Sequence, residues 1–313
     1  MLMSTQGIGY ANGKIILMGE HSVVYGEPSV AIPFPATQIK TTVQAAEGET
    51  TIECLFYKGL LNDMPELLES LKAVIQVSLD RLGQNESLSI NIDSTIPAER
   101  GMGSSAAVAV ATTRGIYDFY KQALSHEELL EIVDISEKIA HGNPSGLDAL
   151  MTSSSTPYYY IKGQPVTPIE LRLAAVLVVA DTGKTGQTKE AVASIGEKIR
   201  GKNKALYQRK ITELGRLAKD SKDYLSHNQP EQLGLAMNQA QNLLSELGVS
   251  SLELDALVVS ALSHNALGAK LTGGGRGGCM IALARNLNEA QEIATALEEA
   301  GAKATWLYEM SGD

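Results

Sequence analysis

The chain has 313 residues, 44% of them hydrophobic and 20% charged, with a formal net charge of −10. This is the composition of a folded soluble protein, and the length allows two domains. The excess of acidic residues disfavours nucleic-acid binding, which needs a surface rich in Lys and Arg. The longest apolar run, 173–180, is too short to span a membrane, and the two cysteines have no metal-ligand spacing. No signal-peptide pattern is seen, so we expect a cytoplasmic protein with reduced thiols and no membrane or nucleic-acid partner.

Strands and helices alternate irregularly along the first half of the chain. The expected extended segments are 8–18, 21–26, 29–45 and 87–93, and the expected helices are 65–82, 104–120 and 125–141. Pro33 and Pro35 interrupt the third extended segment and imply an edge or a bend there. Gly83 ends the first helix, and Ser125 with Glu128 forms a capping box that opens the third.

The second half has longer helices between fewer strands. Strands are expected at 173–182, 267–272, 279–284 and 303–308, and helices at 188–200, 205–226, 230–247, 251–264 and 287–300. This change of rhythm predicts an α+β protein with two domains, residues 1–170 and 171–313.

A glycine-rich loop precedes the helix expected at 104. Residues 97–107 read Pro-Ala-Glu-Arg-Gly-Met-Gly-Ser-Ser-Ala-Ala. The glycines permit a tight turn, and a serine stands where a helix cap is wanted. Free backbone N–H groups at a helix start bind phosphate, so the loop is expected to hold a phosphorylated ligand. The loop matches neither a Walker motif nor a dinucleotide-binding fingerprint.

Two carboxylates follow in the next helix and turn. Glu137 shares a helix face with Leu130 and Val133, so it is either ion-paired or a metal ligand, and Ser105 would complete a Mg²⁺ site with it. Asp148 follows the rigid turn 141–147 and is either a helix N-cap or a catalytic group.

A lysine and a second glycine loop complete the candidate residues. Lys14 lies in an apolar strand, which suggests a partner carboxylate or a bound phosphate unless the position is an exposed edge. Five glycines within 271–279 exceed the needs of a hairpin and indicate close approach to a ligand or to the first glycine loop. Arg276 either faces a phosphate or is solvated.

Three separated motifs together resemble the GHMP small-molecule kinases. They are residues 13–26 (Gly-Lys-Ile-Ile-Leu-Met-Gly-Glu-His-Ser-Val-Val-Tyr-Gly), residues 97–107, and residues 270–279 (Lys-Leu-Thr-Gly-Gly-Gly-Arg-Gly-Gly-Cys). The first motif, and the segment His-Gly-Asn-Pro-Ser-Gly-Leu-Asp at 141–148, are most similar to the mevalonate kinase branch of that family.

The resemblance implies a fold, a reaction and a role for each site residue. The fold would combine a ribosomal S5 domain 2-like N-terminal domain with a ferredoxin-like C-terminal domain, the site lying in the cleft between them, and the protein would be a homodimer. The reaction would be ATP-dependent phosphorylation of the C5 hydroxyl of mevalonate. The implied residues are the catalytic Asp148 and Lys14; the ATP-binding Gly101, Met102, Gly103, Ser104, Ser105 and Ala106; the Mg²⁺ ligands Ser105 and Glu137; and, near mevalonate, Glu20, His21 and Thr188.

Other functions stay open at this point. They are phosphomevalonate or sugar kinase activity, a related decarboxylase, and a nucleotide-binding protein without turnover. One departure from the family pattern bears on nucleotide affinity: Glu99 and Arg100 replace small residues at the entrance of the phosphate loop.

Overall fold

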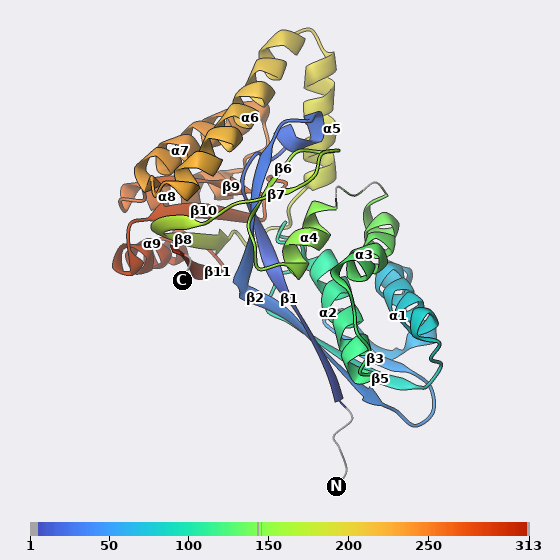
Figure 1. Ribbon diagram of the computed structural model, residues 1–313. Helices are drawn as coiled ribbons and strands as arrows, with labels where there is room; N and C mark the ends of the chain where they lie inside the picture. The colour runs from blue at the N-terminus through green and yellow to red at the C-terminus, as the bar shows by residue number, and fades with distance from the viewer. Residues whose placement is uncertain (1–5, 143, 145, 312–313) are drawn as a thin grey trace. The chain divides into compact units, whose positions relative to one another are not determined.

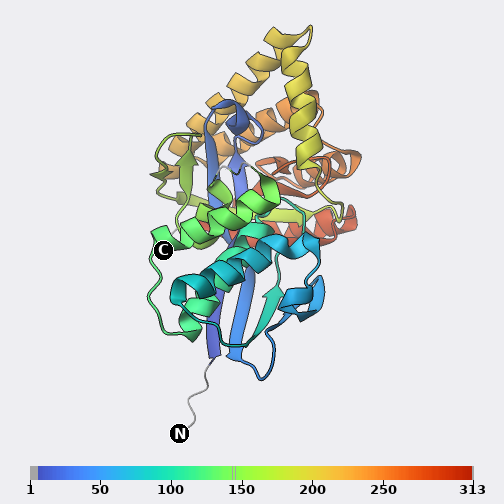
Figure 2. The same cartoon turned by 90° about the vertical axis from the view of Figure 1, so that its right-hand side faces the viewer.

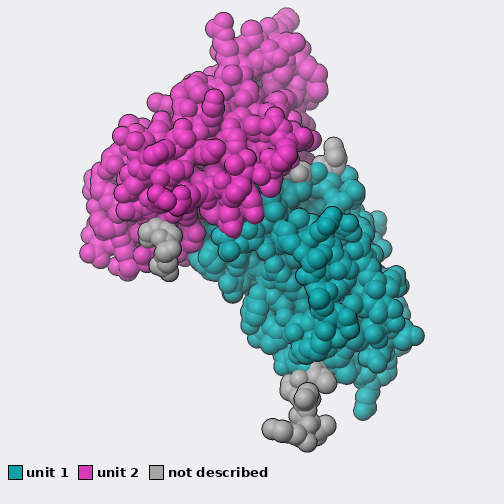
Figure 3. Space-filling model, in the orientation of Figure 1, with its two compact units in different colours: residues 1–14, 33–98, 103–155 teal, residues 15–32, 99–102, 156–313 magenta. Residues whose placement is uncertain are grey.

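The computed structural model describes residues 6–142, 144 and 146–311, so Asn143 and Ser145 of the turn before Asp148 lie outside the described residues. The described chain forms two compact units, coloured separately in Figure 3. Unit 1 consists of the residues up to 14, of 33–98 and of 103–155. Unit 2 consists of residues 15–32, 99–102 and those from 156 onward. Two long strands and the phosphate loop each pass from one unit to the other. The division into domains at residue 170 stays a prediction.

Unit 1 contains a sheet covered by helices. Its strands are β1 (Gln6–Met18) and β2 (Ser29–Ala45), which both continue into unit 2, and β3 (Thr51–Cys54), β4 (Tyr57–Leu60) and β5 (Leu88–Ser94). Its helices are α1 (Glu69–Leu82), α2 (Ser104–Phe119), α3 (His126–His141) and α4 (Leu147–Ser153), with short 3-10 turns η2 (Leu61–Asp63) and η3 (Glu66–Leu68). Strand β5 pairs antiparallel with the second half of β2 and parallel with β3, and β3 pairs antiparallel with β4. Helices α1, α2 and α3 pack on one another and lie on one face of these strands (Figures 1 and 2).

The local signals of unit 1 explain its elements. Leu88, Ile90 and Ile92 alternate along β5 and are all buried, as period-2 patterning predicts. Helix α1 ends at Gly83 in the left-handed conformation. The Ser125 hydroxyl caps α3 by accepting a hydrogen bond from the backbone N–H of Glu128 at 3.1 Å. These predictions are confirmed.

Unit 2 contains a four-stranded antiparallel sheet in the order β11-β8-β10-β9. Its strands are β8 (Arg172–Asp181), β9 (Gly268–Thr272), β10 (Cys279–Ala284) and β11 (Ala304–Ser311), and β6 (Tyr158–Tyr160) and β7 (Thr167–Pro168) pair beside the first residues of β2. Its helices are α5 (Thr188–Arg200), α6 (Lys204–Ser226), α7 (Pro230–Leu247), α8 (Leu252–Ser263) and α9 (Leu287–Glu299), preceded in the chain by the 3-10 turn η1 (Ser22–Tyr25). Helices α7, α8 and α9 pack on the sheet. Over the described ranges, no helix is both long enough and apolar enough to cross a membrane.

Two sequence expectations need correction. Residues 22–25 form η1 and not a strand: His21 has a positive φ of 61°, and the chain turns there. Strand β2 runs without a break through Pro33 and Pro35, because its pairing with β6 ends at Ala31 and its pairing with β5 begins at Ile39. The prolines therefore fall where the strand changes partners on that side.

Candidate active site

Lys14 and Asp148 form the centre of the candidate site in unit 1. Lys14 Nζ lies 3.1 Å from Asp148 Oδ1, and the lysine side chain is 5% exposed whereas the aspartate is 38% exposed. Lys14 comes from β1, and Asp148 lies in the first turn of α4. The buried lysine thus has the partner carboxylate that its apolar strand predicted, and the aspartate keeps a surface that a substrate can reach.

Glu137 lies close to this pair, on the buried side of α3. Burial raises the pKa of its carboxyl, and the negative charge of Asp148 raises it further, whereas His141, a hydrogen bond with Ser105, and Lys14 lower it. His141 Nε2 stands 3.9 Å from Glu137 Oε1. Unit 1 therefore brings together Lys14, Ser105, Glu137 and Asp148, which come from four separate elements.

The surroundings of Glu137 fit a divalent cation. Its Oε1 atom is buried, and no hydrogen-bond partner for it occurs among the described residues. A buried carboxylate oxygen beside a serine hydroxyl suits Mg²⁺, which binds through few protein oxygens and keeps waters or substrate phosphates as its other ligands. Within the described residues, no cluster of three or more His, Cys, Asp or Glu side chains able to hold a metal occurs. Ser105 and Glu137 are thus the residues that would hold a divalent cation, with phosphate oxygens as further ligands.

Helix α2 begins at Ser104, directly after the phosphate loop. The expectation that a serine caps this helix is wrong: the N-cap is Gly103, at φ 74°, and makes no side-chain cap hydrogen bond. The first-turn N–H groups of Ser104, Ser105 and Ala106 have no partner four residues earlier in the helix, and such groups bind anions. A Cβ at Gly103 would lie 2.9 Å from Lys14 Cγ, so only glycine allows this close approach to the lysine.

Gly101 and Met102, the first part of the predicted ATP-binding loop, belong to unit 2. Met102 is buried, and a Cβ built on Gly101 would lie 3.5 Å from the Cα of Gly273. The predicted close approach of the two glycine loops is therefore confirmed. Arg276 in the second loop does not stand free, because its Nε donates a hydrogen bond to the carbonyl of Gly248 at 3.2 Å.

The charged pair at the loop entrance is anchored within unit 2. Arg100 Nε donates to Asp181 Oδ1 at 2.9 Å, and its two terminal nitrogens donate to Thr185 Oγ1 at 3.3 Å and to the Gly183 carbonyl at 3.2 Å. The backbone carbonyl of Glu99 accepts a hydrogen bond from the N–H of residue 186 at 3.1 Å. Arg100 thus holds the entrance of the phosphate loop against the 181–186 loop.

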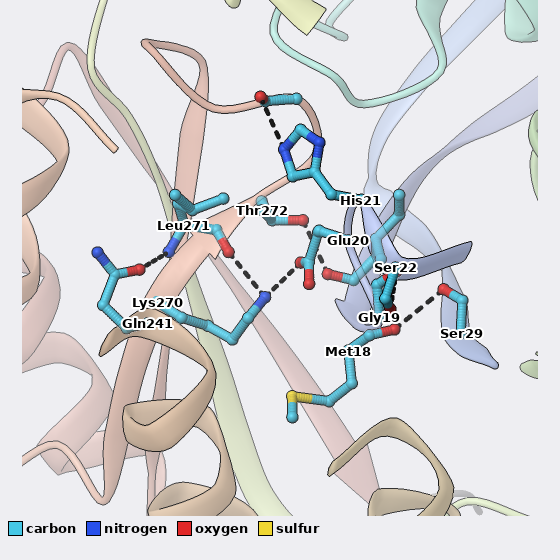
Figure 4. A network of polar contacts seen from close by, with 12 residues as sticks. Met18, Gly19, Glu20, His21, Ser22, Ser29, Gln241, Lys270, Leu271 and Thr272 are labelled. Atoms are coloured by element: carbon cyan, nitrogen blue, oxygen red, sulfur yellow. Dashed lines mark hydrogen bonds and ion pairs between the residues drawn. The ribbon is translucent and has the colours of Figure 1, made fainter. Parts of the chain in front are cut away.

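The three residues expected near mevalonate lie in unit 2, around the second glycine loop. His21 is 5% exposed, and its Nε2 lies 3.1 Å from the carbonyl oxygen of Gly274 (Figure 4). Thr188 is exposed at the start of α5, and a Cβ at Gly274 would collide with its hydroxyl at 2.0 Å. Gly274 therefore adjoins both His21 and Thr188. Glu20 differs from them, because its side chain has no exposed surface and forms an ion pair with Lys270.

Lys270 is a residue whose contacts the sequence reasoning missed. It stands in β9 between Ala269 and Leu271, and all three are buried. A lysine flanked by apolar residues in a strand is the same pattern that singled out Lys14. The sequence alone could therefore have identified Lys270 as a buried, paired lysine.

Comparisons with known proteins give the family. The model of the GHMP kinases N terminal domain matches residues 69–155, and that of the GHMP kinases C terminal domain matches residues 217–303. The chain is 33% identical to a mevalonate kinase of Pyrococcus horikoshii, over 93% of this chain and 92% of the relative. It is also similar to the crystal structure of mevalonate kinase from methicillin-resistant Staphylococcus aureus (33% identity, TM-score 0.77, 98% and 99% of the two chains covered). A further similar structure is L. major mevalonate kinase in complex with R-mevalonate (25% identity, TM-score 0.83, 98% and 97% covered). The chain belongs to the GHMP kinase family.

Proposed function

We propose that this chain transfers the γ-phosphoryl group of ATP to the C5 hydroxyl of mevalonate. The observation that carries the proposal is the Lys14–Asp148 pair, 3.1 Å apart, beside Ser105 and Glu137 in unit 1. Phosphoryl transfer needs positioning and charge neutralisation more than covalent chemistry, and this cluster supplies both. Similarity to relatives named mevalonate kinase, along 93% of the chain, supports mevalonate as the acceptor.

The residues of the proposed site have the following roles. The first-turn N–H groups of α2, with Gly101 and Met102 before them, bind the phosphates of ATP. Lys14 neutralises charge on the γ-phosphoryl group and fixes the carboxylate of Asp148. Asp148 orients the C5 hydroxyl and accepts its proton, a contribution of about 10²–10⁴-fold for a general base.

Ser105 and Glu137 are the residues that would hold Mg²⁺. When bound, the ion neutralises charge on the phosphate oxygens during transfer. Burial and the neighbouring aspartate raise the pKa of Glu137, so both disfavour its charged form. A positive charge beside this oxygen would favour the carboxylate.

His21 and Thr188 are proposed to contact mevalonate, and Glu20 to act through His21 because its own side chain is fully buried. The homodimer implied by the family resemblance stays a prediction.

An alcohol panel tests the function. ADP release is measured with R-mevalonate, 5-phosphomevalonate, homoserine and galactose at equal concentrations. We expect kcat/KM for R-mevalonate to exceed that for every other alcohol by a factor on the order of 10², which differential binding in one pocket can supply. A preference for another alcohol would reassign the substrate, and ATP binding without transfer to any of them would support the non-catalytic alternative.

A further inference from the structure

Unit 2 contains a fully buried ion pair whose lysine has no role in the proposed reaction so far. The side chains of Lys270 and Glu20 are both 0% exposed and are paired with each other, and Lys270 Nζ also donates to the carbonyl of Leu271 at 2.7 Å (Figure 4). Burial lowers the pKa of the Lys270 amino group, and Glu20 raises it. Removing two charges from water is so unfavourable that a buried pair is weak support for stability alone. The pair therefore calls for another explanation.

The residue next to Glu20 has a strained backbone. His21 has a φ of 61°, a conformation that residues other than glycine seldom adopt and that persists only where the surroundings hold it. The turn is held by hydrogen bonds from the N–H of Ser22 to the carbonyl of Glu20 at 2.7 Å and from the N–H of Val23 to the carbonyl of Gly19 at 3.2 Å. The Glu20 side chain adds an anchor directly before the strained residue.

The loop that follows the strand of Lys270 contacts the imidazole of His21. The loop after β9 offers the carbonyl of Gly274 to His21 Nε2 at 3.1 Å. A carbonyl only accepts, so Nε2 carries the proton, and in a neutral ring Nδ1 keeps its lone pair. Burial is the main reason that the pKa of His21 falls to about 4, so the ring is neutral at physiological pH.

Strand β9 is itself held at the two residues that follow Lys270. The side-chain oxygen of Gln241 accepts a hydrogen bond from the N–H of Leu271 at 2.9 Å, and the Thr272 hydroxyl donates to the carbonyl of Ile16 at 2.8 Å. Figure 4 shows these contacts around the ion pair. Strand β9 and the loop that follows it thus contact both Glu20 and His21.

We propose that Lys270 is a positioning residue for substrate binding: it anchors Glu20, and through Glu20 it fixes His21 so that Nδ1 is presented as a hydrogen-bond acceptor. This inference rests on the proposed function, in which His21 contacts mevalonate. It adds a residue that does not touch the substrate but sets the geometry of one that does.

Three variants test the proposal. Lys270→Met removes the cation that is paired with the buried Glu20 carboxylate and is expected to destabilise the fold. The double variant Lys270→Met with Glu20→Gln removes both charges, and buried pairs replaced in this way commonly regain stability. Lys210→Met is the matched control, because it also removes a Lys–Glu ion pair of unit 2, the one that joins α6 to Glu246 of α7.

The readouts are Tm and the kinetic constants for each substrate. We expect the double variant to have a Tm near that of the wild type but a KM for mevalonate raised about tenfold or more, as the loss of one oriented hydrogen bond to a substrate implies. Its KM for ATP is expected to be unchanged, and Lys210→Met is expected to change neither constant. A normal KM for mevalonate in a stable double variant would overturn the proposal, as would equal rises in both KM values.

A substrate-free measurement separates this proposal from the proposed function. In ¹⁵N-histidine spectra, wild-type His21 is expected to show the tautomer protonated at Nε2, and the double variant to show exchange between tautomers. An unchanged His21 spectrum in the double variant would contradict the positioning role. Failure of the wild-type chain to phosphorylate mevalonate would instead contradict the proposed function. The spectra of the two proteins could still be compared, because they are recorded without substrate.

Discussion

Lys14 and Asp148 differ in exposure although their charged atoms lie 3.1 Å apart: the lysine side chain is 5% exposed and the aspartate 38%. The lysine is fixed inside the unit, while the aspartate presents its carboxylate to solvent. This asymmetry suits a pair in which the cation stays in place and the carboxylate meets an incoming hydroxyl group.

Asp148→Asn is expected to lower kcat by about 10²–10⁴-fold, because the amide cannot accept the hydroxyl proton. ATP affinity, measured by calorimetry, is expected to stay close to the wild-type value. Asp134→Asn is the control, since Asp134 is also an exposed, lysine-paired aspartate of unit 1, on α3. Near-normal turnover in folded Asp148→Asn would remove Asp148 from the catalytic role.

Glu137→Gln is expected to raise the Mg²⁺ concentration needed for half-maximal activity, about tenfold or more, because a neutral amide is a weaker ligand for a hard cation. The measurement is a Mg²⁺ titration at fixed ATP. Glu131→Gln on the same helix is the control, because Glu131 is 58% exposed and paired with Arg81. An identical titration for Glu137→Gln and the wild type would return Glu137 to a structural role.

Arg100→Ala is expected to raise KM for ATP about tenfold, because it removes charge-assisted hydrogen bonds that hold the entrance of the phosphate loop. Arg100→Lys is expected to recover only part of the loss, since an ammonium group lacks the planar fork of donors. Arg216→Ala, which removes an exposed arginine of unit 2, serves as the control. If Arg100→Ala binds ATP normally, the hydrogen bonds from Arg100 to the 181–186 loop have no effect on nucleotide binding.

The histidine predicts a specific dependence of stability on pH. Because the pKa of His21 falls from 6.5 to about 4 on folding, the unfolded chain binds a proton more readily than the folded one between these values. The free energy of unfolding is therefore undiminished by this group above pH 6.5. As the pH falls towards 4, protonation of the unfolded chain at this histidine lowers it by about 3 kcal/mol. Denaturant unfolding of the wild type and His21→Gln across this range measures the difference. Parallel pH profiles for the two proteins would contradict the lowered pKa.

Most secondary structure could be predicted because its signals are local. Alternating apolar residues gave β5, and Ser125 with Glu128 marked the start of α3. The error at residues 22–25 has a physical cause: Val23, Val24 and Tyr25 favour strands, but the strained turn at His21 redirects the chain into a 3-10 helix. Here tertiary contacts override intrinsic propensity.

The site could be predicted only in part. The apolar setting of Lys14 indicated a partner carboxylate or a phosphate, but the identity of Asp148 as that partner came from the family resemblance, because no local pattern links residues so far apart in the chain. Arg100 shows the same limit, since its partners Asp181 and Thr185 come from a distant loop. The buried Glu20 could not be told from an exposed substrate ligand until its pairing with Lys270 was seen.

The most direct test of the central claim is a ³¹P NMR spectrum of the wild-type chain incubated with ATP, Mg²⁺ and R-mevalonate. We expect a phosphomonoester resonance, coupled to the C5 methylene protons of mevalonate, to grow in step with ADP. ADP accompanied by inorganic phosphate, or no change in the spectrum, would contradict it.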